Sequence, residues 1–468
     1  MGSERRPSRD QEELERFERM VRERKEIYFD VEEFEAITDR YLDRGAHARA
    51  LEVLEYAERL HPDAPTLQLR KAQVLFRSGR TRKALEILDT LSGLLPYEQE
   101  VPLTKAQIHG QHGDHWKAVQ AYQDAINIGE LSDAELHLDL AFEYENLERY
   151  ELAIETLHQA LRIDPTNESA VHELAYCYES DGRIEDGIEA YKAFLDEHPY
   201  SHTAWYDLGN SYIKLAEYQK AIEAYGFCLA IEERVPSALF NKGNAHVQLG
   251  QYHEAIDAYQ ECLRVEGPMA VTYSYIGECY EKLGHYENAV QRYQEAIALD
   301  PEWSDAWSGI GVVRQLQDRP REAHGYLRKA VELDPEDPDK WAAYGKLLFE
   351  LASYEETRAA FSKLLRLAPD DREGRLLFSE LEQQEGDPDT AIRIIEEGLG
   401  FDPEASELKY RLSALLFMEG RSKEGMQELE EALRNDPEGH TMLLDYFPEA
   451  TSIPSIMDLI ETYKLGDR

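Results

Sequence analysis

The sequence predicts an all-α fold, a solenoid of helical hairpins that stack in chain order. Similar residues return every 34 positions, and prolines recur at multiples of the same interval. Within each interval, apolar residues fall three and four positions apart in two successive runs, which is the spacing of two amphipathic helices. We therefore expect each 34-residue repeat to form one hairpin that buries its apolar face against its neighbours.

The repeated motif is clearest in the middle of the chain. One copy reads Trp205, Leu208, Gly209, Tyr212, Tyr218, Ala221 and Tyr225. A later copy reads Tyr273, Gly277, Tyr280, Gly284, Tyr286, Ala289, Tyr293, Ala296 and Pro301. The register is checked independently by the prolines that close the repeats, which are Pro62, Pro96, Pro165, Pro199, Pro301, Pro335, Pro369, Pro403 and Pro437.

Counting from these prolines, and from Glu130, Glu233 and Gly267 at the matching positions, gives twelve repeats with one extra residue at 133. The repeats are 31–64, 65–98, 99–132, 134–167, 168–201, 202–235, 236–269, 270–303, 304–337, 338–371, 372–405 and 406–439. Two flanks remain, residues 1–30 and 440–468. No segment is left that could form a separate catalytic domain of ordinary size.

Small residues occupy the positions where the two helices of a hairpin must approach closely. In the first helix they are Gly209, Gly243, Gly277, Gly311 and Gly345, and in the second Ala221, Ala255, Ala289 and Ala323. The turn between the helices needs a residue that tolerates positive φ, and one shared position there holds Gly79, Gly113, Gly182, Gly250, Gly284, Gly386 and Gly420. The proline that closes a repeat ends the second helix, because it lacks an amide proton.

With these residues in this register, the chain resembles tetratricopeptide repeat proteins over residues 31–439. The match is weakest in the second, third, eleventh and twelfth repeats, where Lys71, Lys105, Phe378 and Gly425 replace small or apolar residues. The resemblance implies a right-handed superhelix with a concave groove lined mainly by first helices. Folds of this family usually bind peptides or protein segments, and their ends need caps.

The two flanks are predicted to be those caps. Residues 1–30 carry eight basic and nine acidic residues, which favours a capping helix over a nucleic-acid-binding arm. This helix is expected over residues 10–28, with apolar residues at near-helical spacing: Leu14, Phe17, Met20, Val21 and Ile27. At the other end, a short thirteenth first helix stops at Pro448 and is followed by a last helix with one apolar face, formed by Ile456, Leu459, Ile460 and Tyr463. A tail that docks into the groove of its own or a neighbouring chain is the alternative.

Charge and cysteine content limit the partners and the compartment. The chain has 94 acidic and 51 basic residues, so its formal net charge is −43 at pH 7, and such a surface repels nucleic acid. The acidity is compatible with a salt-rich cytoplasm or with codon bias. No apolar signal-peptide core and no membrane-length apolar run is present in the sequence. Cys177, Cys228, Cys262 and Cys279 are expected to be reduced and buried, which predicts a cytoplasmic protein.

The sequence contains no motif that predicts catalysis or a cofactor. A phosphate-binding loop ending in Gly-Lys-Ser/Thr, a Gly-x-Ser-x-Gly elbow and paired Cys-x-x-Cys motifs are all missing from the sequence. His109, His112 and His115 recur at spacings of three beside Asp114, but Gly110 and Gly113 interrupt the stretch. Exposed turn residues are therefore favoured over a zinc or nickel site. We predict a non-enzymatic protein that needs no cofactor, with a metal-binding protein or a hidden hydrolase as the minor alternative.

In tetratricopeptide repeats, positions two, five, six, nine, twelve and thirteen of the first helix tend to face the groove. An amide can donate to and accept from a peptide backbone, and aromatic rings bury apolar side chains with little entropy loss. The predicted peptide-binding residues, from positions five, six and nine of the fourth to eighth repeats, are Phe142, Tyr176, Tyr206, Asn210, Phe240, Asn241, Asn244 and Tyr275. The alternative is that Asn210 and Asn244 form hydrogen bonds between repeats and that the aromatic residues extend the core.

The resemblance also bears on the chemistry of the ligand. One subclass of the family, the chaperone-tail binders, binds a C-terminal carboxylate with two asparagines and three cationic side chains. In this chain Asn210 and Asn241 match the two asparagines, but the positions of the cations hold Tyr206, Val271 and Tyr275. An acidic tail is therefore disfavoured, and an apolar or basic segment is expected. Acidic residues at groove-facing positions would attract its Lys or Arg side chains: Glu135, Asp139, Glu145, Glu173, Glu179, Asp207 and Glu278.

The predicted function is thus a protein-interaction scaffold that binds a peptide or protein segment in its groove. A structural protein that self-assembles or bridges partners through its last helix is the alternative. The sequence leaves the partner, the pathway and the oligomeric state open, because one repeat scaffold serves many ligands.

Overall fold

The computed structural model describes residues 9–23, 27–129 and 133–466, and over these residues it contains helices and no strands. Residues 24–26, within the predicted N-terminal helix, and Glu130, one of the repeat-closing positions, lie outside the described residues. The chain divides into two compact units, Met1–Glu233 and Arg234–Arg468, called here the N-terminal and C-terminal units. Each unit is a stack of helical hairpins, as the sequence predicts.

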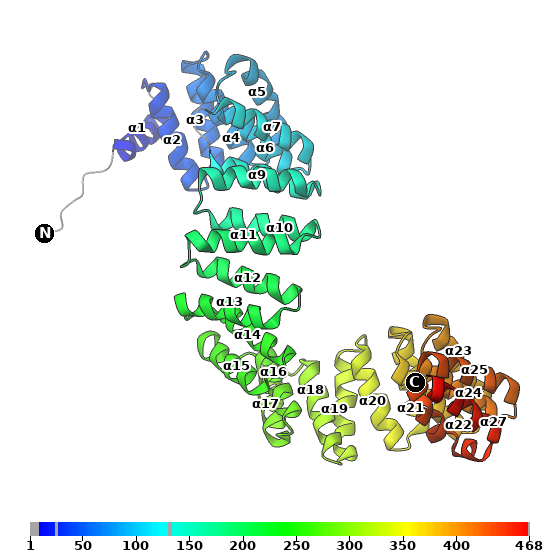
Figure 1. The fold of residues 1–468 in the computed structure, drawn as a ribbon. Helices are drawn as coiled ribbons and strands as arrows, with labels where there is room; N and C mark the ends of the chain where they lie inside the picture. The colour runs from blue at the N-terminus through cyan, green and yellow to red at the C-terminus, as the bar shows by residue number, and fades with distance from the viewer. Residues whose placement is uncertain (1–8, 24–26, 130–132, 467–468) are drawn as a thin grey trace. The chain divides into compact units, whose positions relative to one another are not determined.

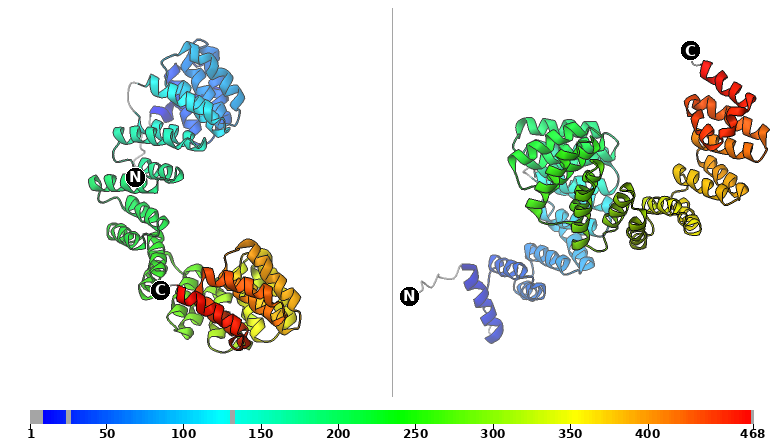
Figure 2. Two further views of the ribbon diagram at one scale, coloured as in Figure 1. Left: turned by 45° about the vertical axis from the view of Figure 1, so that its right-hand side comes forward. Right: turned by 90° about the horizontal axis from the view of Figure 1, so that it is seen from below.

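The helices of the N-terminal unit are α1 (Arg9–Glu23), α2 (Val31–Asp43), α3 (His47–Leu60), α4 (Pro65–Arg77), α5 (Thr81–Leu94), α6 (Glu100–Gln111), α7 (His115–Ile128), α8 (Ala134–Asn146), α9 (Tyr150–Ile163), α10 (Glu168–Ser180), α11 (Ile184–Glu197), α12 (His202–Lys214) and α13 (Tyr218–Ile231). From α2 onward each even-numbered helix packs against the next odd-numbered helix as a hairpin, and successive hairpins lie side by side in chain order (Figures 1 and 2).

The C-terminal unit continues the pattern with α14 (Pro236–Gln248), α15 (Tyr252–Glu266), α16 (Ala270–Lys282), α17 (Tyr286–Leu299), α18 (Ser304–Leu316), α19 (Pro320–Leu333), α20 (Pro338–Glu350), α21 (Tyr354–Leu367), α22 (Arg372–Gln384), α23 (Pro388–Phe401), α24 (Ser406–Met418), α25 (Ser422–Asn435), the 3-10 helix η1 (Pro437–Gly439), α26 (His440–Tyr446), the 3-10 helix η2 (Pro448–Ser452) and α27 (Pro454–Gly466).

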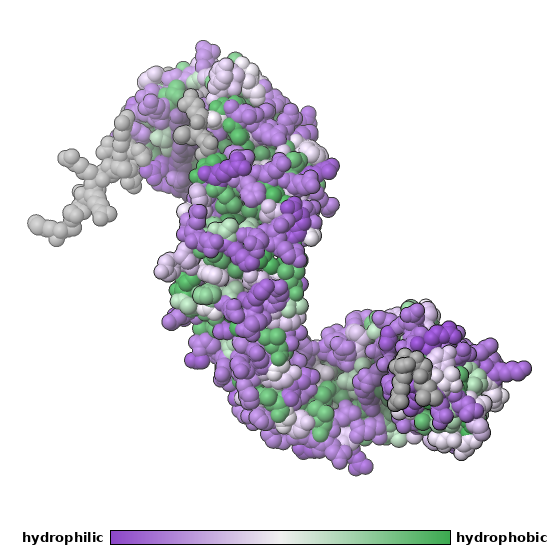
Figure 3. Space-filling view, in the orientation of Figure 1, coloured by the Kyte–Doolittle hydropathy of each residue, from purple (hydrophilic) through white to green (hydrophobic). Residues whose placement is uncertain are grey.

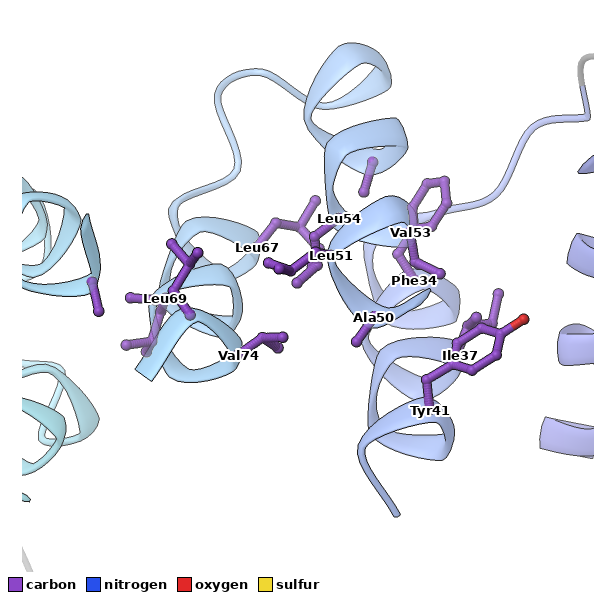
Figure 4. Packing of buried hydrophobic residues seen from close by; sticks show 14 of the residues in the cluster. Phe34, Ile37, Tyr41, Ala50, Leu51, Val53, Leu54, Leu67, Leu69 and Val74 are labelled. Atoms are coloured by element: carbon purple, nitrogen blue, oxygen red, sulfur yellow. The ribbon is translucent and has the colours of Figure 1, made fainter. Parts of the chain in front are cut away.

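Apolar side chains fill the space between helices, and the core therefore continues from hairpin to hairpin. At the start of the chain Phe34 of α2, Leu54 of α3 and Leu67 of α4 are completely buried in one cluster (Figure 4). Each completely buried side chain of this size contributes roughly 1.5–3 kcal/mol of hydrophobic stabilisation. The outer surface is by contrast largely hydrophilic, with apolar residues scattered among polar ones (Figure 3).

The close approach within a hairpin depends on the first-helix glycines. A Cβ atom built on Gly209 would lie 2.5 Å from Cε1 of Tyr225, and one on Gly243 would lie 2.5 Å from Cε1 of Tyr259. Real Cβ atoms do not approach so closely, so only glycine lets the ring lie flat on the first helix at these positions. The predicted role of these glycines is confirmed.

The turn between the two helices has positive φ in all twelve repeats. The predicted glycines adopt it, as does Gly45 in the first repeat. In the other four repeats the same position holds a residue with a Cβ atom, and φ is between 54° and 57°: Glu148, Ala216, Asp318 and Ala352. A side chain disfavours this left-handed region by about 1–2 kcal/mol, so these four turns store strain that glycine would relieve.

Neighbouring repeats are joined by a hydrogen bond that reaches back across their boundary. Nε1 of Trp205 donates to the carbonyl oxygen of Pro199 at 2.9 Å, and Trp307 and Trp341 donate in the same way to Pro301 and Pro335. The last residue of a repeat also caps the next helix, as Ser201 does by accepting from the amide of Ala204. Both contacts fix where the next hairpin begins.

The N-terminal flank packs as a cap, although it differs from the predicted helix. α1 ends at Glu23, and residues 27–30 are extended rather than helical, because Asp30 and Glu33 form a capping box that starts α2 at Val31. Leu14, Phe17 and Met20 are buried, but Val21 is half exposed, which corrects its predicted place on the buried face. Arg16 holds α1 against α2 through Glu33 at 2.7 Å.

The C-terminal flank covers the last repeat. α26 ends before Pro448, as predicted, and α27 packs against α25. On the apolar face of α27, Ile456 and Ile460 are buried, and the hydroxyl of Tyr463 donates to Glu430 at 3.3 Å. This helix therefore shields the end of the core from water.

We predict that glycine at the strained turns stabilises the protein. Ala216→Gly and Ala352→Gly should each raise the free energy of unfolding by about 0.5–1 kcal/mol, since relief of the left-handed strain exceeds the entropy that glycine loses. Urea denaturation followed by circular dichroism measures the change. The control is Ala298→Gly, an exposed position inside α17, which should destabilise by about 1 kcal/mol. Destabilisation at all three positions would contradict the strain.

We predict the opposite effect for alanine at the hairpin contact. Gly209→Ala should destabilise by about 1–3 kcal/mol, because its Cβ would overlap the ring of Tyr225. Gly226→Ala in α13 is the matched control, since nothing lies within 4 Å of its added Cβ; helix propensity should make it more stable by about 1 kcal/mol. Equal melting temperatures for the two variants would refute the steric argument.

Candidate functional site

The eight predicted groove residues are divided between the two units. Phe142, Tyr176, Tyr206 and Asn210 belong to helices α8, α10 and α12 of the N-terminal unit. Phe240, Asn241, Asn244 and Tyr275 belong to α14 and α16 of the C-terminal unit. The two sets are therefore described separately.

Phe142 and Tyr176 are the exposed members of the set. They occupy the ninth position of α8 and of α10, the first helices of successive hairpins, and are 58% and 47% exposed. Phe142 is absent from the buried cluster that includes Leu140 and Ala141 of the same helix. Large apolar rings so exposed are available to bury a ligand side chain.

The other two residues of the N-terminal set lie against the core. The hydroxyl of Tyr225 donates to Oδ1 of Asn210 at 2.8 Å, and the ring of Tyr206 lies 5.9 Å from that of Tyr225. Tyr225 is completely buried, so Asn210 satisfies a buried hydroxyl inside its own hairpin. This hydrogen bond lies within one repeat; hydrogen bonds of Asn210 and Asn244 between repeats remain a prediction.

The C-terminal set shows the same arrangement. The hydroxyl of Tyr259 donates to Oδ1 of Asn244 at 2.6 Å. Phe240 and Tyr275 pack on the buried ring of Tyr259 and on each other, with ring centroids 5.4–5.8 Å apart, while Asn241 is partly buried on α14. The half-buried rings of Phe240 and Tyr275 thus extend the core and present one edge to solvent.

The tyrosines that organise these residues were not singled out as part of the site. Tyr225 and Tyr259 follow the asparagines by fifteen positions, and each spans its hairpin to reach the asparagine amide. The pairing of Asn and Tyr at this separation in two successive repeats is the sequence signal that would have revealed it.

Acidic side chains accompany the exposed rings of the N-terminal unit. The sixth position of three first helices holds Asp139, Glu173 and Asp207, and each carboxylate interacts with a neighbouring group. Oδ2 of Asp207 lies 2.9 Å from Nδ1 of His172, and the Asp207 carboxylate keeps the pKa of His172 above its usual value. Asp139 and Glu173 thus lie on the helices that carry Phe142 and Tyr176, and Asp207 lies on the next first helix, α12.

Glu145 of α8 is the most perturbed acid of the group. Partial burial, together with the nearby Glu173 carboxylate, raises the pKa of Glu145 to about 7. The thiol of Cys177 donates to Oε1 of Glu145 at 3.3 Å and opposes part of this rise. Glu145 therefore changes charge near neutral pH, where an ordinary glutamate is ionised.

The histidines of the predicted cluster have separate partners. Nε2 of His112 lies 2.9 Å from the Thr81 hydroxyl, and Nδ1 of His115 lies 2.7 Å from Oε2 of Glu143. In the described part of the chain no three His, Cys, Asp or Glu side chains are grouped so that they could hold a metal ion. All four cysteines are free and buried, in agreement with the sequence prediction. None of the helices that the structure describes is both long enough and apolar enough for a membrane crossing.

Four family models match successive parts of the chain. The tetratricopeptide repeat model matches residues 41–108, and that of anaphase-promoting complex subunit 5 matches residues 95–146. The model of anaphase-promoting complex, cyclosome, subunit 3 matches residues 146–228. The model of the cilia and flagella-associated protein 70 C-terminal domain matches residues 229–443. None of the four descriptions names an enzyme.

Solved structures resemble the chain only loosely, and no curated protein sequence matches it. The anaphase-promoting complex hetero-tetramer Cut9–Hcn1 is 16% identical, with 82% of this chain and 90% of that chain covered and a TM-score of 0.42. MamA is 25% identical, covers 34% of this chain and 92% of its own, and has a TM-score of 0.33. YrrB, described as a TPR protein with an unusual peptide-binding site, is 20% identical, covers 41% and 97%, and has a TM-score of 0.35.

We predict that the N-terminal unit loses stability as the pH rises toward neutrality. Below the ordinary glutamate pKa, Glu145 is neutral in both the folded and unfolded states; between that value and about 7 the unfolded chain ionises first, so folding becomes less favourable. Glu145→Gln should therefore raise the melting temperature at pH 8 but not at pH 4. Calorimetry at both pH values measures this, with the exposed Glu151→Gln as control. An equal gain in melting temperature at the two pH values would argue against a raised pKa of Glu145.

Proposed function

Because the chain is a tetratricopeptide repeat protein, we propose that it is a non-enzymatic interaction scaffold that binds a segment of a partner protein on its first helices. The proposal is supported most directly by Phe142 and Tyr176, two exposed aromatic residues at the same position of successive hairpins. Exposed rings on a rigid helical frame bind apolar side chains with little loss of conformational entropy.

The proposed segment combines apolar and basic side chains. Asp139 lies three residues before Phe142, and Glu173 lies three residues before Tyr176, so each ring has a carboxylate on the same side of its helix. A Lys or Arg beside an apolar residue would pair with these carboxylates while the rings cover its neighbour. The net charge of −43 also favours a basic segment, because it attracts positive charge at longer range.

The remaining predicted residues have a supporting role in this proposal. Asn210 orients Tyr225 in the N-terminal unit, and Asn244 orients Tyr259 in the C-terminal unit, so each is expected to shape the first-helix surface of its own unit. Tyr206 would extend that surface in the N-terminal unit, and Phe240, Asn241 and Tyr275 would extend it in the C-terminal unit. Alanine at Asn210 or Asn244 would leave a buried hydroxyl without its acceptor and perturb folding. These positions are therefore poor tests of binding.

The last helix supports scaffolding over self-assembly. Its apolar residues Ile456 and Ile460 are buried against the same chain, so they offer no apolar face to a second copy. We also propose a cytoplasmic location, on the ground that four free, buried cysteines suit a reducing compartment.

We predict that Phe142→Ala with Tyr176→Ala removes most segment binding without unfolding the protein. The probes are three pools of labelled peptides of about twelve residues, rich in Leu and Phe and containing Lys and Arg, Ser and Gln, or Asp and Glu. The Lys and Arg pool should bind the wild-type chain most tightly, and the double variant should weaken that binding about tenfold or more, as loss of an aromatic anchor does. Fluorescence anisotropy measures the affinities.

Tyr97→Ala with Tyr200→Ala provides the control, because these two tyrosines are even more exposed but lie in the turns between hairpins. Their loss should leave the affinity unchanged. Equal loss of basic-pool and acidic-pool binding in the Phe142 and Tyr176 variant would refute the charge preference of this surface. If the variant that lacks Phe142 and Tyr176 binds the peptides as tightly as the wild type, the binding site does not include these two rings.

A further inference from the structure

A second surface of different chemistry lies at the beginning of the N-terminal unit. A cavity of about 800 Å³ separates α1 from the hairpin of α2 and α3. Its apolar lining comes from Phe17, Met20 and Val21 of α1, Tyr41 of α2 and Tyr56 of α3. Phe17, Met20 and Tyr41 are mostly covered, whereas Val21 stands half exposed at the opening. Figure 1 shows α1 beside α2 at this end of the chain, and Figure 4 shows Tyr41 on the α1 side of α2.

The charged lining of this cavity is basic, although the chain as a whole is strongly acidic. Arg22, Arg49 and Arg59 face two acids, Glu18 and Glu52. Both acids are engaged: Glu52 pairs with Arg49 at 2.5 Å, and Glu18 accepts a hydrogen bond from Tyr41 at 3.2 Å. Arg22 has no ion pair among the described residues, and Arg59 has only the ring of Tyr56, 5.0 Å from its guanidinium carbon. Two guanidinium groups are thus left for an anionic partner.

The length of the lined face distinguishes a chain segment from a small anion. Arg49, Glu52, Tyr56 and Arg59 follow one face of α3 over eleven residues, and the distance from the first to the last is roughly 15 Å along the helix. Ligand pockets usually measure about 300–1,000 Å³, so this one lies in the upper part of the range and has room for several apolar side chains. A lone carboxylate would fill little of it.

We propose that this cavity is a docking site for an acidic segment of a partner protein that carries large apolar side chains. The apolar side chains enter between α1 and α3, beside Phe17 and Val21, and the carboxylates pair with Arg22 and Arg59. Guanidinium groups bind carboxylates in a fixed, two-pronged geometry, which would set the register of the segment. The charge preference is the opposite of that proposed for Phe142 and Tyr176, so the two surfaces select different segments.

The test uses the full chain and two labelled helical peptides of about fourteen residues. Both carry Leu and Phe at positions i, i+3, i+4 and i+7; the remaining positions are Glu in one peptide and Gln in the other. Fluorescence anisotropy at about 50 mM and about 300 mM salt should show that the Glu peptide binds more tightly than the Gln peptide and weakens with salt. Equal affinities for the two peptides, or binding of neither, would overturn the proposal.

Variants then locate the site. Arg22→Gln with Arg59→Gln should weaken binding of the Glu peptide about tenfold or more and leave the Gln peptide unaffected. Val21→Ser, at a half-exposed position that does not support the core, should weaken both peptides. Arg19→Gln is the control, because Arg19 is exposed on the same helix but does not line the cavity. An equal effect of Arg19→Gln would show that only the general charge of α1 matters.

Sedimentation of the wild-type chain without peptide tests whether a second copy of this chain, rather than a partner segment, fills the cavity. A monomer at every concentration agrees with a partner segment. Self-association that Arg22→Gln with Arg59→Gln abolishes would assign the cavity to a second copy of this chain and overturn the proposal. Binding of the basic and apolar peptide pool should be unchanged in the arginine variants. If the Glu peptide does not bind the cavity, the proposal for the surface around Phe142 and Tyr176 is therefore unaffected.

Discussion

In five successive hairpins, from Gly209 to Gly345, a ring or a leucine of the second helix lies on a glycine of the first. The added Cβ would come within 2.5–2.8 Å of that side chain in each case. The contact sets how closely the two helices pack, and close packing is what lets each hairpin present a continuous apolar face to the next. Three of these side chains are tyrosines, and two of them, Tyr225 and Tyr259, are completely buried.

The same contact determines which residues remain available for binding. Tyr225 and Tyr259, which lie flat on the first helix, each donate a hydrogen bond to the asparagine at its ninth position, Asn210 or Asn244. Tyr293 lies on Gly277 in the same way but donates to Glu281 instead. Phe142 and Tyr176 occupy the ninth position of their helices, yet they take part in no such pair and stay exposed. A buried tyrosine fifteen residues later does not by itself make the ninth position structural, because Tyr191 follows the exposed Tyr176 at this separation and hydrogen bonds to Asp207 instead. The ninth position is structural where it holds an asparagine that accepts the hydroxyl, as Asn210 and Asn244 do.

Charge divides the N-terminal unit into surfaces of different character. Carboxylates follow the first helices α8, α10 and α12, where burial, together with the nearby Glu173 carboxylate, raises the pKa of Glu145 to about 7. Arg22 and Arg59, which have no ion pair among the described residues, line instead the cavity where α1 covers the first hairpin. The net charge of −43 has the sign of the acidic surface but not of the arginine-lined cavity, because it averages over the whole chain. At the cavity, local composition rather than the total charge decides what the surface attracts.

The sequence by itself determined the all-helical hairpin architecture, the glycine contacts and the cysteine burial. The reason is that the 34-residue period shows the same residue types at the same positions many times, so the assignment of one repeat can be compared with the others. The sequence did not distinguish the exposed Phe142 and Tyr176 from Asn210 and Tyr275, which contact the core, because all four share positions predicted to face the groove. Only the packing shows which of these side chains already have partners within the protein. The cavity beside α1 was equally hidden. It depends on how a helix outside the repeat, whose end is set by the Asp30 capping box, lies against α3, and no period constrains that placement.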